Sequence, residues 1–371
     1  MANKLSFVGE KVKLGEVCKI VTGNTPSTKC SEFYANKDIQ FYKPGDFDNM
    51  APCVLRMSES WIAEPARKKA RIVSANSILI TCIGVIGKVG ITTKEAAFNQ
   101  QINAVLPPSY LDSKYLAHQL FYKAKALRKQ ANQAVVPILN KSSFAAIQIN
   151  LPSLDVQYEI SNSLNSILQI IQDRYYLVNE LEQLVKSRFV EMFGDPASLR
   201  PKFGKKPISD LAKVSSGATP SRKRPEYYKG DIPWVKTGEV AGAGTILQTE
   251  EHITQEAIDD SACHLLPANT ILIAMYGQGD TRGKAALLTI EAATNQACAA
   301  LEFCDKVNPH YALTHFHLCY ENLRSLSHGG NQKNLNLQII KSYAMMLPPI
   351  ALQQEFAAFV TQVDKLRFVK Q

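Results

Sequence analysis

Loop segments rich in cations and amides are the part of this sequence that could do chemistry. In the second half of the chain three cations follow Ser221, and a glycine-flanked loop carries Arg282 and Lys284. Lysine and arginine attract phosphate groups whatever the sequence, while arginine, asparagine and glutamine can pair with two atoms of one base edge. These residue types therefore indicate contact with a nucleic acid. The candidates are Lys29, Lys43, Lys88, Arg222, Lys223, Arg224, Lys236, Arg282, Lys284, Asn331 and Lys333.

Each of these cations, taken alone, could equally be a solvated surface charge. For the segment 221–224 contact is favoured, because three adjacent cations would repel one another unless a polyanion neutralised them. The neighbouring Thr-Pro-Ser segments, 25–27 and 219–221, are expected mainly to fix a turn. The Asn-Gln pairs 99–100 and 295–296 follow apolar strands and could equally be hydrogen-bonded within a domain.

The chain contains the same succession of motifs twice. Gly-Asn-Thr-Pro-Ser at 23–27 returns as Gly-Ala-Thr-Pro-Ser at 217–221, and the order then holds through the Asn-Gln pairs to Leu-Pro at 151–152 and 347–348. The offset drifts only between 193 and 196 residues. A period of this length indicates two homologous domains, because the repeats of solenoid proteins are only about 20 to 50 residues long.

Two segments resemble catalytic motifs but depart from them. Asn-Pro-His-Tyr at 308–311 is close to the tetrapeptide of adenine methyltransferases, but His310 breaks the pattern and the first copy has Asp112 at the matching position. Asn308 and Asp112 are better explained as helix N-caps. The segment 279–285 has the wrong glycine spacing for a nucleotide phosphate loop and ends in alanine. The seven histidines show no metal-ligand spacing, so neither catalysis nor a metal site is expected.

Composition and charge limit the class of protein. The 371 residues are 46% hydrophobic, enough for two domains with their own cores, and no apolar run is long enough for a membrane span. The eight cysteines show no C-x-x-C pair, which is typical of reduced thiols in a cytoplasm. The net charge is +9 over residues 1–156, −3 over 157–195, +2 over 196–348 and +1 over 349–371. The basic globular spans favour a polyanionic partner.

The acidic connector is predicted to be one long helix over 157–192. Apolar residues recur every seven positions and no proline or glycine interrupts them, so the helix would be about 54 Å long. The apolar face of so long a helix needs a partner helix to cover it. The segment after Leu347 has apolar residues at the matching positions of the second copy, which predicts an antiparallel coiled coil between the two helices. The second helix, 349–371, is shorter than the first. The apolar residues assigned to partner binding are Leu164, Ile167, Ile171, Val178, Leu181, Val185, Val360 and Val363.

Each copy is strand-rich first and helical afterwards. Short apolar runs at 77–81 with 88–91, and at 270–275 with 284–288, are separated by glycine-containing loops and predict hairpins. Helices are expected over 113–129 and 309–326. The fold class is therefore α+β, with two homologous strand-rich domains joined by long helices.

These motifs, in their duplicated order, resemble the specificity subunit of Type I restriction–modification systems over nearly the whole chain. The resemblance rests on five motifs. They are the Gly-x-Thr-Pro-Ser loops, the Tyr-Lys-Gly-Asp-Ile-Pro-Trp segment at 228–234, the Thr-Arg-Gly-Lys loop at 281–284, the Asn-Gln pairs, and the Gly-Asn-Gln-Lys-Asn-Leu-Asn segment at 330–336 before Leu-Pro-Pro. It implies target-recognition domains at 1–156 and 196–348, each reading one half of a bipartite DNA site, with conserved helices at 157–195 and 349–371.

The resemblance also implies partners. Double-stranded DNA, two methyltransferase subunits and, where present, two restriction subunits with translocase activity would bind this chain in a prokaryotic cytoplasm. S-adenosylmethionine, ATP and Mg²⁺ would bind those partners and not this chain. A protein–protein scaffold with an incidental basic surface is the alternative, and a self-contained methyltransferase is a weaker one; DNA binding that falls steeply with salt would separate the first two.

Overall fold

The computed structural model describes residues 9–48, 51–55, 57–131, 139–242, 244–277, 279–326 and 334–368. It divides into two compact units, residues 1–174 and 175–371. The division falls inside the longest helix, α4 (Leu154–Phe193), so the two ends of this helix belong to different units. Asn331 and Lys333 lie outside the described residues.

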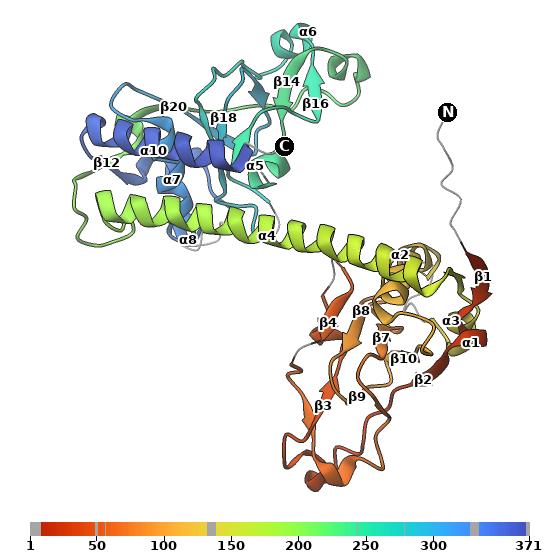
Figure 1. Cartoon of the computed structure of the whole chain (residues 1–371). Helices are drawn as coiled ribbons and strands as arrows, with labels where there is room; N and C mark the ends of the chain where they lie inside the picture. The colour runs from red at the N-terminus through yellow and green to blue at the C-terminus, as the bar shows by residue number, and fades with distance from the viewer. Residues whose placement is uncertain are drawn as a thin grey trace. The chain divides into compact units, whose positions relative to one another are not determined.

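Unit 1 contains a five-stranded sheet of order β2-β10-β7-β8-β4, a second sheet of order β5-β3-β9-β6, and a β1-β11 pair (Figure 1). Its strands are β1 (Glu10–Lys13), β2 (Lys19–Thr22), β3 (Ile39–Tyr42), β4 (Cys53–Leu55), β5 (Trp61–Ile62), β6 (Ile72–Val73), β7 (Ile78–Thr81), β8 (Val89–Thr92), β9 (Ala96–Phe98), β10 (Ile102–Leu106) and β11 (Gln148–Leu151). Its helices, besides the start of α4, are α1 (Leu14–Val17), α2 (Ser113–Ala131) and α3 (Lys141–Ala145).

Unit 2 repeats this plan with a five-stranded sheet of order β13-β20-β17-β18-β15, a β16-β14-β19 sheet and a β12-β21 pair. Its strands are β12 (Lys205–Pro207), β13 (Ala212–Ser216), β14 (Ile232–Val235), β15 (Thr245–Ile246), β16 (Glu251–Ile253), β17 (Ile271–Ala274), β18 (Ala285–Leu288), β19 (Ala293–Thr294), β20 (Cys298–Phe303) and β21 (Ala344–Met346). Its helices are α5 (Thr237–Gly242), α6 (Gln255–Asp259), α7 (Pro309–Leu318), α8 (Tyr320–Ser325), α9 (Leu337–Ser342) and α10 (Ile350–Phe368).

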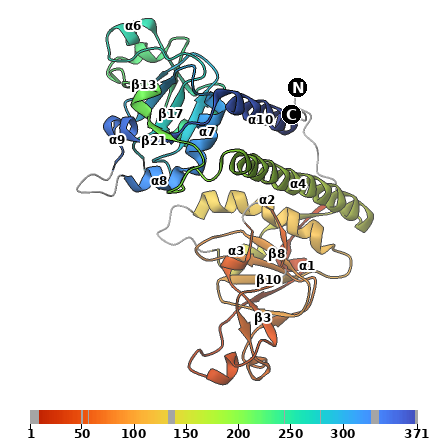
Figure 2. The same ribbon diagram turned by 90° about the vertical axis from the view of Figure 1, so that its left-hand side faces the viewer.

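The predicted hairpins are confirmed in both units. β7 pairs antiparallel with β8 and β17 with β18, in each case through short strands whose side chains are buried on both faces. In unit 1 one hydrophobic cluster lies between the large sheet and α2, and another joins the large sheet to the second sheet. The matching helix in unit 2 is α7, which lies against the large sheet (Figure 2). The sheets therefore form a framework from which the motif loops, residues 23–27 in unit 1 and 217–221 in unit 2, emerge.

The two predicted N-caps are also confirmed. The Asp112 carboxylate accepts a hydrogen bond from the Tyr115 amide at 2.7 Å, and the Asn308 side chain accepts from the His310 amide at 3.0 Å. Pro309 occupies the first position of α7, where no amide hydrogen is needed. The Asn-Pro-His-Tyr segment is thus the beginning of a helix.

The prediction of one helix over 309–326 was wrong, because the helical structure is interrupted at Cys319 and forms two helices, α7 and α8. After the break, the Tyr320 hydroxyl donates to the Asp280 carbonyl at 2.8 Å, and Arg324 pairs with the Asp280 carboxylate at 3.0 Å. The change of direction lets α8 fasten the glycine-rich loop. Propensity within 309–326 carries no sign of these partners, which lie about 40 residues earlier in the chain.

Within unit 2, α10 lies beside the carboxyl-terminal half of α4 and runs in the opposite direction (Figure 1). Phe356 packs edge-on against Phe189 and Phe193, with ring centroids 5.4 and 5.6 Å apart, and Arg188 pairs with Glu355 at 3.2 Å. These contacts form a local aromatic cluster. A heptad coiled coil along the remaining length of α4 stays a prediction.

The two units differ at one position where a side chain of α2 or α7 bonds the backbone of β11 or β21. In unit 1, Gln119 bonds both the carbonyl and the amide of Asn150, at 2.9 and 2.8 Å. In unit 2 the matching residue is His315, whose Nε2 accepts from the Met346 amide at 3.3 Å while Nδ1 has no hydrogen-bond partner. His315 is fully buried, and this burial lowers its pKa to about 3. The imidazole is therefore neutral in the folded protein.

Replacing this histidine should make unit 2 less sensitive to acid. Below pH 6.5 this histidine binds a proton in the unfolded chain but stays neutral in the folded protein. The free energy of unfolding therefore decreases as the pH is lowered, by about 2 kcal/mol from pH 7 to pH 5. His315→Gln supplies the side chain that unit 1 uses and removes this contribution. The measurement is the urea unfolding of unit 2, followed by Trp234 fluorescence in a Trp61→Phe background. It compares the protein with His315 and the His315→Gln variant at pH 7 and at pH 5. Equal losses in the two chains would contradict the assignment.

Candidate nucleic-acid interface

The two Thr-Pro-Ser loops are held in the same way in both units. The Thr25 hydroxyl donates to the Gln100 carboxamide at 2.7 Å, and Thr219 makes the same bond to Gln296. The Tyr34 hydroxyl donates to the Pro26 carbonyl at 2.7 Å, and its counterpart Tyr228 bonds the Pro220 carbonyl at 2.6 Å. The conserved spacing between the copies therefore encodes a side-chain frame for each loop.

The glycine that opens each loop is required by close backbone approach. A Cβ atom on Gly23 would overlap the carbonyl oxygen of Asn99, and one on Gly217 would overlap the carbonyl oxygen of Thr294. The Asn-Gln pairs are used within the units as well. The Asn295 side chain accepts from the Thr237 hydroxyl at 3.0 Å and from the Ala297 amide at 3.1 Å. These amides serve the frame.

Arg222 follows the second loop and lies on an aromatic surface. Its guanidinium carbon is 4.0 Å from the Tyr228 ring centroid and 5.3 Å from that of Trp234, which is a cation–π arrangement. Its Nη1 is 2.8 Å from the Glu251 carboxylate. The guanidinium holds the pKa of that carboxyl below its ordinary value. Arg222 is thus already neutralised by its own unit.

Arg224 and Lys236 are neutralised in the same manner. Arg224 pairs with Glu226, Glu256 and Asp260 at 2.9, 2.6 and 2.9 Å and lies over the Tyr227 ring. The Lys236 ammonium lies 2.7 Å from Glu250 and 3.2 Å from Glu251. The premise that the cations at 222–224 need a polyanion was therefore wrong, because carboxylates from β16, α6 and the adjoining loops supply the countercharge. Lys223, between the two arginines, is exposed and makes no ion pair with the described residues.

The glycine-rich loop is a fastened structure. Gly279 and Gly283 adopt φ angles of 60° and 88°, which favour glycine, and α8 holds the intervening Asp280. The Lys284 ammonium lies 4.7 Å from the Tyr320 ring centroid. Arg282 is half-buried at the turn. Sequence reasoning missed Tyr320 and Arg324 because their part in this loop depends on the break at Cys319.

In unit 1 the three predicted cations have different surroundings. The Lys88 ammonium donates to the carbonyls of Pro44 and Phe47 at 3.2 and 3.1 Å, so it secures the loop after β3. Lys29 and Lys43 are exposed. Contact of these side chains with DNA stays a prediction.

The helix residues assigned to partner binding fall into two groups. Three of the residues in the first group are buried, namely Leu181, Val360 and Val363, and Val185 is partly buried against the same cluster as Val360. The earlier residues on α4 are exposed, with exposed fractions of 37%, 53%, 45% and 40% for Leu164, Ile167, Ile171 and Val178. Four apolar side chains exposed on one helix form a surface that another protein could cover.

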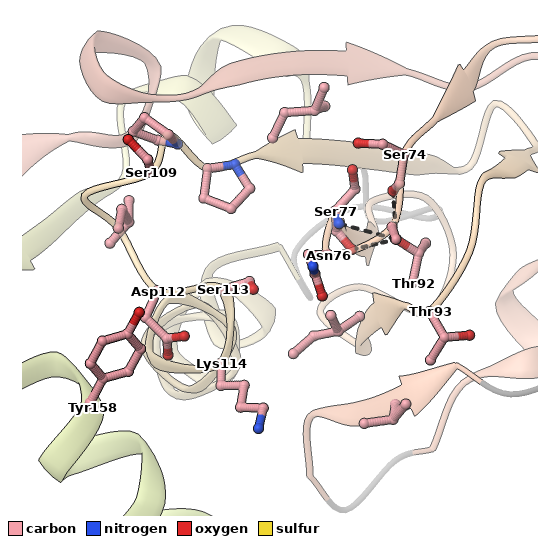
Figure 3. A pocket seen from close by; sticks show the side chains of 17 residues that line it. Ser74, Asn76, Ser77, Thr92, Thr93, Ser109, Asp112, Ser113, Lys114 and Tyr158 are labelled. Atoms are coloured by element: carbon pink, nitrogen blue, oxygen red, sulfur yellow. Dashed lines mark hydrogen bonds between the residues drawn. The ribbon is translucent and has the colours of Figure 1, made fainter. Parts of the chain in front are cut away.

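A hollow of about 540 Å³ lies in unit 1 beside the start of α2 (Figure 3). One of its hydroxyls is engaged internally: Thr92 accepts from the Ser77 amide at 3.1 Å and donates to the Ser74 carbonyl at 2.9 Å. Lys114 extends along one side of it, and Asp112 is occupied as a helix cap.

The parts of the chain that the structure describes contain no cluster of three metal-ligating side chains. Nor does any helix among them have the length and apolar character needed to cross a membrane. The eight cysteines are all free, and five of them are buried.

Comparison with known proteins agrees with the duplicated architecture. The model of the Type I restriction modification DNA specificity domain matches residues 9–183 and again 202–371. The MjaIX specificity subunit of Methanocaldococcus jannaschii is 23% identical over 370 residues, covering 94% of this chain and 85% of its own. The HindI specificity subunit of Haemophilus influenzae is 28% identical over 163 residues, which cover 43% of this chain and 35% of its own.

Solved structures support the same fold. The S subunit of the Type I restriction–modification system of M. genitalium has a TM-score of 0.62 at 12% identity, covering 98% of this chain and 92% of its own. A chain from a study of complex assembly in the type I system has a TM-score of 0.52 at 13% identity over the same shares. Since the family model matches both halves in order, this chain belongs to the family of Type I restriction–modification DNA specificity proteins.

Proposed function

We propose that the chain is the DNA-recognition subunit of a Type I restriction–modification complex and that each unit reads one half of a bipartite double-stranded target. The observation that supports this most is the repeated loop frame: Thr25 with Gln100, and Thr219 with Gln296, fix equivalent loops in both units. A fixed frame whose intervening residues differ between the two units suits a module that must present different side chains to different sequences. Each half of the target would then be read separately.

Exposed apolar residues on α4 support a second part of the proposal, which is that this helix binds the partner subunits. Leu164, Ile167 and Ile171 would dock two methyltransferase subunits and, where the system restricts DNA, lie near its two restriction subunits. S-adenosylmethionine, ATP and Mg²⁺ would bind those subunits, and this chain would be non-catalytic. The complex would methylate adenine in the prokaryotic cytoplasm. A scaffold without DNA recognition is less favoured, because the family model that matches both halves describes DNA specificity.

Exchange of one unit tests the proposal directly. Replacing residues 205–345 with the same part of another specificity subunit should change one half of the methylated sequence and leave the other half intact. The incoming segment should keep an aromatic residue at position 311, because Tyr311 stacks on Phe189 of α4 at 5.2 Å. Mapping methylated adenines in host DNA, with and without the gene, gives the readout. A change in both halves together would mean that the units do not read DNA independently.

The spacing between the half-sites should follow the length of α4. Half-site spacing generally reflects protein geometry, and α4 is one continuous helix of 40 residues. Inserting or deleting one heptad between Leu168 and Val185 should change or abolish the spacer while both half-site sequences stay the same. The same methylation map measures it, and a conservative Leu184→Met variant serves as control. An unaltered spacer would rule out α4 as a rigid strut.

Two cations of unit 2 should differ in what they recognise. Arginine can pair with guanine at two points, so Arg282→Ala should cost about 1–3 kcal/mol and relax one position of the target. Lys223→Ala should weaken binding to every sequence and lower the salt slope by about one unit. Binding of both variants to single-base-substituted duplexes over a range of salt concentrations compares them. If Arg282→Ala lost affinity uniformly, with all base preferences intact, Arg282 would be a phosphate contact.

A further inference from the structure

The repeated loop motif differs between the units at its second residue, which is Asn24 in unit 1 and Ala218 in unit 2. The Asn24 carboxamide donates to the Lys69 carbonyl at 2.6 Å and accepts from the Arg71 amide at 2.7 Å. Two bonds from one side chain therefore hold the segment 69–71 beside the motif loop. Ala218 has no side-chain group that could do this.

The segment that Asn24 holds is basic and exposed. Lys68, Lys69 and Arg71 are exposed, as is Lys29 on the motif loop, and none of the four makes an ion pair with the described residues. The neighbouring Arg67 differs, because Glu64 and Glu95 engage it at 2.5 and 2.7 Å. Both ribbon views place this end of unit 1, beyond β3, far from α2 (Figures 1 and 2). Four cations thus remain available around one fixed loop.

The corresponding end of unit 2 is organised otherwise. The Ala218 carbonyl accepts from the Trp234 indole at 3.2 Å and from the Cys263 thiol at 2.9 Å, so this loop packs on its own unit. Carboxylates of α6 and its C-cap lie there instead: Glu256 and Asp260 neutralise Arg224. The same backbone frame therefore presents a free positive charge in unit 1 and a largely compensated one in unit 2.

We propose that Asn24 organises a phosphate-binding edge from Lys29, Lys68, Lys69 and Arg71, and that unit 1 supplies the larger share of the phosphate attraction when this chain binds DNA. The inference rests on the proposed DNA-recognition function and adds residues and an asymmetry to it. Each phosphate neutralised by a cation contributes about 0.9 to the slope of log affinity against log salt on duplex DNA. The edge is therefore measurable without knowledge of the target sequence.

The test measures binding of the full chain to a random-sequence duplex over a range of salt concentrations. Lys68→Ala with Lys69→Ala should lower the salt slope by about two units. The matched control removes two cations from unit 2, Arg222→Gln with Arg224→Gln, and should lower the slope by less than half as much. Circular dichroism checks that both double variants are folded. Should the control unfold, Lys236→Gln with Lys213→Gln takes its place, since both of these lysines are ion-paired within unit 2.

Asn24→Ala separates positioning from charge, since it removes no cation and copies the residue of unit 2. It should lower both the affinity and the slope without lowering the thermal midpoint of unit 1. Reduced affinity with an unchanged slope would overturn the positioning role, and a slope unchanged by the Lys68/Lys69 variant, or lowered equally by the control, would overturn the proposed asymmetry. If the unmodified chain, alone and with methyltransferase subunits, failed to bind the duplex at low salt, the proposed function itself would fail.

Discussion

One buried carboxamide joins each sheet framework to its long helix. Gln157 and Gln353 are fully buried near the start of α4 and α10. Gln157 accepts from the Asp112 amide at 2.8 Å and donates to the carbonyls of Pro152 and Tyr110, while Gln353 makes the same three bonds with Asn308, Pro348 and Lys306. An unpaired amide would be costly in such a site, so the first turn of the helix, the turn before it and the cap of α2 or α7 are fixed together. The sheet that α2 or α7 covers, and the loops that leave that sheet, depend on this connection.

The duplicated frame allows the units to diverge where the frame is satisfied in more than one way. Gln119 and His315 both accept from the amide of a residue in β11 or β21, but only Gln119 also donates to the carbonyl of that same residue. Tyr115 and Tyr311 meanwhile keep the same bond to that strand, at 3.1 and 2.9 Å. Homologous positions in the two units thus keep the backbone arrangement while the side chains that hold it differ. The same is true around the loops 23–27 and 217–221, where the backbone frame is shared and the surrounding charge differs.

Local patterns predicted the elements well, because the signals for them lie within a few residues. The heptad periodicity indicated α4, Asn308 and Asp112 indicated the helix starts, and alternating loops and apolar runs indicated the hairpins. The electrostatic state of the candidate site was beyond such reasoning. Arg224 finds Glu256 and Asp260 at separations of 32 and 36 residues, and Lys88 finds backbone carbonyls more than 40 residues away. A cation's partner depends on the tertiary fold, and one sequence does not reveal it.

The glycines at 23 and 217 limit how this chain can evolve. No side chain fits there, because a Cβ atom would meet a carbonyl oxygen of the neighbouring strand end. The next residue carries no such restriction, and asparagine and alanine both occur at it. Sterics therefore forbid change at one codon and permit it at the adjacent one. Genetic drift and selection would act on the second position of the motif, and a duplicated module could acquire a new surface through single substitutions without losing its loop.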